Sequence, residues 1–286
     1  MTIAKILVPV CGEDSDAAAL RTAVAAARPF ASHVALFAIQ QDPALAVPLV
    51  GVPLTPDAIA AIIDGQTRHA DAAATRARAT MRAVCADAGI AIVRKPERAG
   101  APTCSFRQDW GDVASGIAAE AALSDLVVLG PICWSAREAF NAAFLDVLRE
   151  VRRPLLVAHA EPRPPSRIAI GWDGSAAAAH AVSGAMPFLE RARRVTILTV
   201  ASRGYPAAPT AELEAYLIRH GVAAEHRTID GGSAAAGGVL LAEAARLEAD
   251  MLVAGAYGHD HLREALFGGT TETLAGGRVM PVLLAH

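Results

Sequence analysis

Lysine, aromatic residues and long apolar runs are all scarce in this sequence of 286 residues. Lysine occurs only at Lys5 and Lys95, and neither stands beside a glycine-rich turn. The sequence also has no Gly-x4-Gly-Lys-(Ser/Thr) loop and no Gly-x-Ser-x-Gly elbow. Because efficient phosphoryl transfer needs a cation clamp and an activated nucleophile, these absences argue against a dedicated kinase or ATPase.

Aromatic residues make up 5% of the chain, so its cores must consist mainly of Ala, Val, Leu and Ile. Hydrophobic residues make up 53% and charged residues 19%, which excludes global disorder. No charge-free apolar stretch reaches the roughly 20 residues of a membrane-spanning helix. The short apolar run Ile6–Val10 is typical of a buried strand rather than a signal peptide, and we expect a cytoplasmic protein.

The formal net charge is −3, and no block of like charge stands out. We therefore expect neither nucleic acid nor a membrane as a partner. The four cysteines form no Cys-x-x-Cys pair and are expected to be free thiols: Cys11, Cys85, Cys104 and Cys133. Cys104 lies in a polar stretch, which suggests that its thiol is more exposed than the others.

The sequence repeats itself. Ile6–Gly12 matches Ile168–Gly174, and Pro154–His159 matches Pro281–His286. Between the two copies, the proline-rich segment Glu161–Ser166 can neither continue a helix nor form a central strand. We therefore expect three parts, a domain at 1–160, a linker at 161–166 and a second domain at 167–286.

Within each half, short apolar runs alternate with helix-like stretches. This order predicts an α/β fold with two doubly wound, parallel, Rossmann-like sheets in tandem. The first half contains one long predicted helix, Pro56–Ala88, with Thr55 as its N-cap and Gly89 after its end. The corresponding helix near Ala211–His220 is short, and Asp112 is expected to cap a further helix.

Ligands of open parallel sheets bind beyond the carboxyl ends of the strands, where the strand order switches. Three segments of the second half are expected there: Gly171–Ser175, Val200–Ser202, and Gly255–Gly258 with its continuation to Thr271. Glycines in such turns let the backbone approach a phosphate, and free N–H groups at a helix start favour an anion. Glycines that merely shape tight turns remain the alternative.

Gly255-x-x-Gly258, nine residues and then Gly268 resemble the nucleotide motif of the universal stress protein family, which has an adenine nucleotide alpha hydrolase-like fold. Asp173-Gly174-Ser175 after an apolar strand resembles the end of that family's first strand. The resemblance covers nearly the whole chain, as two such domains in tandem. It implies a stress-response regulatory protein that binds ATP or another adenine nucleotide, with or without Mg²⁺.

Position by position, the resemblance implies three groups of contacts. Adenine and ribose would be bordered by Gly171, Trp172 and Asp173, with Val200 packing on adenine. Gly255 and Gly258 would cradle phosphates, and the terminal phosphates would be held by Gly268, Gly269 and Thr270. One position departs from the family, since Gly269 stands where a Ser or Thr usually follows the third glycine. Trp172 either stacks on the base or fills the pocket.

The first half departs further from this pattern. Cys11 stands in place of Asp173, and Gly130-Pro131-Ile132-Cys133 replaces Gly255–Gly258, so that the second glycine is lost. Pro131 also removes one N–H donor. We therefore expect a degenerate site in the first half, retained for packing or partner contacts.

Three functions remain open on the sequence alone. The first is a regulatory protein that binds nucleotide in its second half and at most hydrolyses ATP slowly. The second is a nucleotide-free structural or interaction module, and the third is an enzyme such as a nucleotidyl transferase. No catalytic residue and no metal site are assigned, since His259 and His261 lack further ligands. The protein partner is unknown, and assembly is either a pseudo-dimer within the chain or a homodimer.

Overall fold

The computed structural model describes residues 2–46, 55–95, 100–131, 138–202, 206–232, 235–256, 273–276 and 279–286. Its strands form a single sheet in the order β3-β4-β2-β1-β5-β6-β11-β10-β7-β8-β9. The strands are β1 Lys5–Pro9, β2 His33–Gln40, β3 Ala91–Ile92, β4 Thr103–Trp110, β5 Leu126–Leu129, β6 Leu155–Val157, β7 Arg167–Gly171, β8 Arg194–Ser202, β9 Ala224–Gly232, β10 Met251–Gly255 and β11 Val282–Ala285.

The strands of the two halves follow the same order. The first strand of each half, β1 or β7, lies between the second strand and a later one, as in β2-β1-β5 and β8-β7-β10. In each half the chain moves outward from the first strand, then returns to its other side. Within each half the paired strands are parallel, as in the β1–β2, β1–β5, β7–β8 and β10–β7 pairs. The predicted α/β class with doubly wound parallel strands is confirmed.

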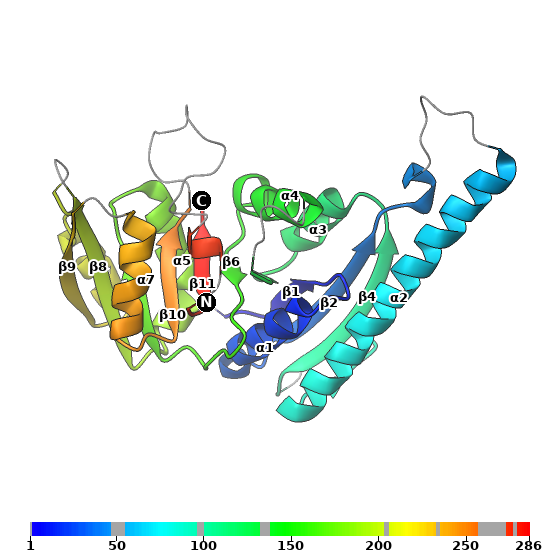
Figure 1. Ribbon diagram of the computed structural model, residues 1–286. Coiled ribbons are helices and arrows are strands. Elements are labelled where there is room, and N and C mark those ends of the chain that lie inside the picture. Colours follow the sequence, from blue (N-terminus) through cyan, green and yellow to red (C-terminus); the bar gives the residue numbers. More distant parts are fainter. Residues whose placement is uncertain are drawn as a thin grey trace.

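The halves are joined by β6 and β11, the last strand of each, which pair antiparallel near the middle of the sheet (Figure 1). Leu156 lies opposite Leu283 in this pairing. The sequence predicts two separate sheets, but the structure has a single continuous sheet. The two halves pair with each other inside the chain, through β6 and β11. Because β6 and β11 run in opposite directions, the carboxyl ends of the two sets of parallel strands lie at opposite edges of the sheet.

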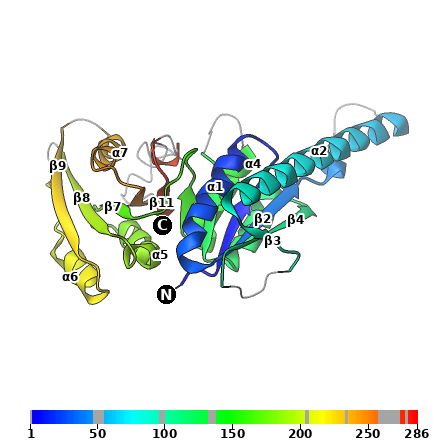
Figure 2. The ribbon, with the colours of Figure 1, turned by 90° about the horizontal axis from the view of Figure 1, so that it is seen from below.

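Helices cover both faces of the sheet (Figure 2). One apolar cluster contains residues of α1, α2, α5 and α6, and the other contains residues of α3, α4 and α7. Strands β1, β5, β10 and β11 are apolar on both faces and almost wholly buried. The helices are α1 Ser15–Ala27, α2 Pro56–Ala88, α3 Val113–Ala122, α4 Glu138–Asp146, α5 Ala176–Leu189, α6 Ala211–Arg219 and α7 Ala236–Arg246, with short turns η1 Arg28–Phe30, η2 Pro43–Ala46 and η3 Val147–Val151.

The helix boundaries follow local chemistry. Thr55 Oγ1 accepts a hydrogen bond from the N–H of Ala58 at 3.3 Å, and Gly89 ends α2 in the left-handed conformation (φ 66°). Asp112 Oδ1 accepts from the N–H of Ser115 at 2.8 Å, which caps α3 as predicted. The predicted bounds of the long helix, Pro56–Ala88, are those of α2.

One prediction about the cysteines is wrong. The sequence predicts a more exposed Cys104, but the side chain of Cys104 is wholly buried beneath α2. The polar residues around it belong to β4, which is buried at its start, at Thr103 and Cys104, and becomes exposed only toward Trp110, so a polar stretch does not imply an exposed thiol. Among the described helices, none combines the length and apolar character that crossing a membrane requires.

Candidate functional site

The carboxyl ends of β10, β7 and β8 lie side by side at one edge of the sheet. Ala254 of β10 pairs with Gly171 of β7, and Gly171 pairs with Leu198 of β8. The strand order switches between β7 and β10, because the chain runs outward from β7 through β8 and β9 before it returns. The structure thus gathers Gly171, Val200 and Gly255, the first residues of the three predicted segments, at a switch point, the usual ligand position in such sheets.

The turn from β7 into α5 is held by its own polar side chains. Gly174 has a φ of +78°, a conformation that favours glycine. Asp173 Oδ1 accepts from the N–H of Ser175 at 2.9 Å, and Ser175 Oγ accepts from the N–H of Ala178 at 3.1 Å. The Asp173 side chain is exposed at this edge. An exposed carboxylate at this turn can accept a hydrogen bond from a ribose hydroxyl.

One of the predicted glycines, Gly255, is required by packing, and a second, Gly171, lies close to the end of a flexible side chain. A Cβ at Gly255 would lie 2.5 Å from the main-chain nitrogen of Ala178 and 2.8 Å from the carbonyl carbon of Ala177. A Cβ at Gly171 would lie 2.9 Å from Leu240 Cδ1. The close approach of β10 to the start of α5 therefore explains Gly255 without any ligand. Because glycine has no side chain, the main chain at Gly255 is also left uncovered.

Trp172 and Val200 lie at the same edge but on opposite faces of the sheet. Trp172 is half-buried against the cluster of α5 and α6, and its Nε1 donates to the main-chain oxygen of Pro209 at 3.0 Å. Val200 packs against the cluster of α7. The indole is thus fixed by the segment that precedes α6.

The remaining predicted phosphate contacts, Gly258, Gly268, Gly269 and Thr270, lie outside the described residues, as do His259 and His261. Of the predicted set, the structure places Gly171, Trp172, Asp173, Val200 and Gly255 at one edge. Within the described ranges, no group of three or more His, Cys, Asp or Glu side chains could hold a metal ion.

The equivalent turn of the first half contains a buried carboxyl group that sequence reasoning missed. The buried carboxylate of Asp16 accepts from the N–H of Gly12 at 2.6 Å and from the N–H of Cys11 at 3.2 Å. Burial raises the pKa of Asp16, although these backbone hydrogen bonds oppose the rise. An Asp in the first turn of a helix is common, so nothing in the sequence marked this one as buried.

Helix α2 closes over the same turn. Gly12 has a φ of +78°, equal to that of Gly174, and a Cβ there would lie 2.3 Å from the main-chain oxygen of Ala73. Arg76 Nε donates to the main-chain oxygen of Gly12 at 2.8 Å. The first-half turn is therefore covered by the protein itself, whereas the described part of the second half has no helix as long as α2.

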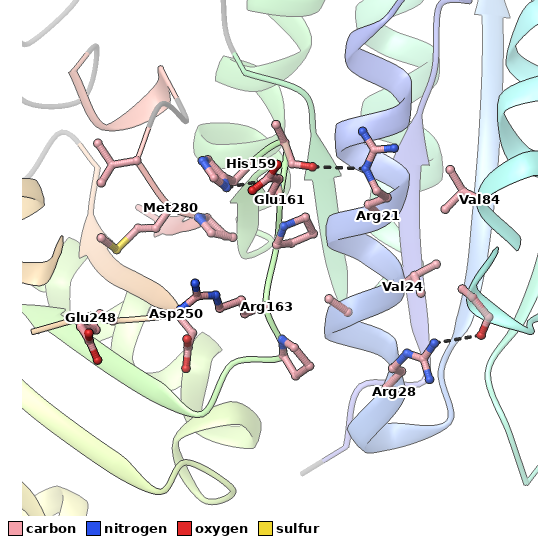
Figure 3. Close-up of a pocket in the computed structure, with 18 of the residues that line it drawn as sticks. Arg21, Val24, Arg28, Val84, His159, Glu161, Arg163, Glu248, Asp250 and Met280 are labelled. Carbon is pink, nitrogen blue, oxygen red and sulfur yellow. Dashed lines mark hydrogen bonds between the residues drawn. The ribbon is translucent and has the colours of Figure 1, made fainter.

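A separate groove of about 970 Å³ lies between the two halves, lined by α1, the end of α2, the linker and the segments before β10 and β11 (Figure 3). Asp250 and Pro281 directly precede β10 and β11, so the groove lies at the amino ends of these strands. Arg21 Nε and Arg28 Nη2 already donate to the main-chain oxygens of Ala160 and Ala88. This groove is at the opposite end of β10 from Gly255, so it is distinct from the predicted site.

These features define an α/β protein of the doubly wound, Rossmann-like type, built as two tandem copies with glycine-bearing turns at the strand ends. Residues 206–286 match the model of the universal stress protein family. The chain carries a universal stress protein domain in its C-terminal region, and the resemblance predicted from the sequence is confirmed.

Solved structures agree with this fold over the whole chain. A universal stress protein from Archaeoglobus fulgidus DSM 4304 is similar with a TM-score of 0.62 and 13% identity, over 98% of this chain and 97% of that one. A functionally unknown protein from Pseudomonas aeruginosa PAO1 is similar with a TM-score of 0.54 and 17% identity, over 99% and 92% of the two chains. Comparison with curated proteins gives no match.

Proposed function

We propose that the second half binds an adenine nucleotide, with ATP as the first candidate, at the carboxyl ends of β7, β8 and β10. The observation that carries the proposal is the meeting of two turns at the switch point, one with the exposed Asp173 and one beginning at Gly255. Occupancy would change contacts with a protein partner, so the function is regulatory binding in a cytoplasmic protein.

The proposal includes one nucleotide per chain. In the first half, Asp16 already occupies the N–H groups of Gly12 and Cys11, and Ala73 and Arg76 of α2 cover the turn. A phosphate brought there would meet a buried carboxylate as well as a helix. This supports a degenerate site in the domain at 1–160 and a single live site in the domain at 167–286.

The proposed site offers binding groups rather than a catalytic set. Its described residues supply main-chain groups, a carboxylate and apolar walls, so hydrolysis of ATP would be slow at most. Mg²⁺ would enter with the nucleotide, bound by its phosphates. The internal pairing of β6 with β11 supports a pseudo-dimer within the chain over a homodimer made through these strands.

Binding can be tested by titrating purified, nucleotide-free protein with ATP and Mg²⁺ in a calorimeter. Asp173→Ala should weaken binding about tenfold or more, because it removes a ribose partner, while Asp14→Ala should leave the affinity unchanged. Asp14 is a matched control, since it lies at the exposed start of α1 in the first half and caps nothing with its side chain. Equal affinity in both variants would reject the site, and two nucleotides per chain would reject the closed first half.

A nucleotide-free interaction module is the second candidate. It is favoured by Gly255, which close packing against α5 explains without a ligand, and by Trp172, whose indole is bound to Pro209. This function predicts no rise in melting temperature with millimolar ATP and Mg²⁺. Binding would stabilise the fold by RT ln(1 + [L]/Kd), so a clear rise rejects this candidate.

A further inference from the structure

The end of β11 holds both main-chain groups of Ala256, the residue that follows Gly255. Ala256 donates its N–H to the main-chain oxygen of Ala285 at 2.8 Å. The imidazole of His286 donates from Nδ1 to the main-chain oxygen of Ala256 at 3.0 Å. The β10–β11 ladder is thus extended beyond β11 by a side chain, and Ala256 is wholly buried.

A second imidazole links His286 to α5. His180 Nδ1 donates to the main-chain oxygen of His286 at 3.0 Å. Because a main-chain oxygen only accepts, Nδ1 carries the hydrogen in both rings. The start of α5 also packs directly on Gly255, through Ala177 and Ala178. Helix α5, His286 and the turn after β10 therefore form one continuous set of contacts at the proposed nucleotide site.

The first half provides an internal comparison. His159 follows β6 as His286 follows β11, and Thr22 of α1 hydrogen-bonds to the main chain of His159 at 3.2 Å. The link from helix to histidine is therefore present in both halves. However, the ring of His159 accepts at Nδ1 from the N–H of Glu161, in the linker, at 3.3 Å. In the half with the Gly255-x-x-Gly258 motif, the imidazole is directed to Ala256 instead.

We propose that His286 is a positioning residue of the nucleotide site, fixing Ala256 and so the start of the Gly255-x-x-Gly258 turn. This role rests on the proposed function. Its physical basis is pre-organisation, since main-chain groups already held in place lose less freedom when a ligand binds. The nucleotide is bound by the turn and not by His286.

The test measures ATP affinity and melting temperature for the full chain with His286→Ala, His286→Asn and His286→Gln. An Asn side-chain nitrogen stands the same number of bonds from Cα as imidazole Nδ1, whereas that of Gln stands one bond further. His286→Ala should weaken ATP binding about three- to tenfold, the effect of one hydrogen bond. Asn should restore most of the affinity and Gln should not.

His159→Ala is the matched control, and it should leave ATP affinity unchanged because this ring bonds to the linker. Unchanged affinity in His286→Ala would overturn the positioning role alone. Equal behaviour of the Asn and Gln variants would overturn it as well, since the loss would then not depend on a donor at Nδ1. If the unaltered chain binds no ATP, the proposed function fails, and this role fails with it.

Discussion

Phe30 and Phe188 meet edge to face, with ring centroids 5.2 Å apart and planes inclined by 79°. Phe30 ends η1 in the first half, and Phe188 lies in α5 of the second half. The guanidinium of Arg191 lies 4.6 Å from the Phe30 ring centroid. Besides the β6–β11 pairing, an aromatic contact therefore holds the two halves together.

Phe188→Ala is expected to lower the free energy of unfolding by about 3–5 kcal/mol, because the ring is fully buried. Phe30→Ala should cost less, since Phe30 is only partly buried. Urea unfolding of both variants and of the double variant would show a coupling of about 0.5–1.5 kcal/mol. Strictly additive losses would mean that the two rings do not depend on each other.

Gly255→Ala is expected to destabilise the fold by about 1–3 kcal/mol. The new methyl group would clash with main-chain atoms of α5, which cannot move away by a change of rotamer. Gly238→Ala is the matched control, in an exposed position of α7 with no atom within 4 Å of the new Cβ. It should stabilise the fold by about 0.5–1 kcal/mol through helix propensity. Thermal unfolding separates the two, and a Gly255→Ala variant as stable as the unaltered chain would contradict the close packing.

The buried Asp16 predicts a dependence of stability on pH. Burial raises the pKa of Asp16 above its usual value of 3.8, so the folded chain keeps a proton that the unfolded chain loses. The stabilisation is fully present below pH 3.8 and is lost as the pH rises through the pKa of the folded state. In Asp16→Asn this slope should be absent, so the stability of the unaltered chain relative to the variant should fall with rising pH.

Denaturant unfolding of the two proteins, measured from below pH 3.8 to neutral pH, would check this. Taking the difference between their free energies of unfolding removes the contributions of the other carboxyl groups, which are the same in both proteins. These include Asp112 and Glu243, whose pKa values are lowered by hydrogen bonds to Ser115 and Arg246. Parallel stability curves would show that Asp16 does not titrate differently in the folded state.

The cysteines should react with iodoacetamide in a fixed order. Cys104 is wholly buried, and its hydrogen bond to the Cys85 thiol, together with burial, raises the pKa of Cys104. Because the thiolate is the reactive form, Cys104 should be modified only after unfolding, whereas the half-exposed Cys11 should react before the buried Cys85 and Cys104. Peptide mass spectrometry would follow each site separately, and equally fast labelling of Cys104 and Cys11 would contradict the burial.

Local chemistry makes part of the fold predictable from the sequence. Thr55, Gly89 and Asp112 mark helix ends by side-chain capping or positive φ, which depend only on neighbouring residues. The apolar runs at Ile6 and Ile168 likewise predict strands buried on both faces. Because each apolar run stops at a turn, the sequence also suffices to assign Asp173 and Gly255 to one edge of the sheet.

Features that depend on distant segments were not predictable. Asp16 is buried next to a turn that α2 covers with residues some 60 positions later in the chain. Cys104 is covered by the same helix, and the indole of Trp172 is fixed by Pro209. In each case the environment of the residue depends on a segment that is distant in sequence and packs against it. A local sequence pattern does not contain this information.

The position of β6 and β11 in the middle of the sheet has a consequence for synthesis. Strand β6 is completed before the second half begins, yet its antiparallel partner is the last described strand to be made. Until β11 emerges, the first half would present Leu155, Leu156 and Val157 as an unpaired apolar edge, the kind of surface on which nascent chains associate. The first half can therefore reach its final protected state only when translation of the second half is nearly finished, and chaperone dependence should be greatest in that interval.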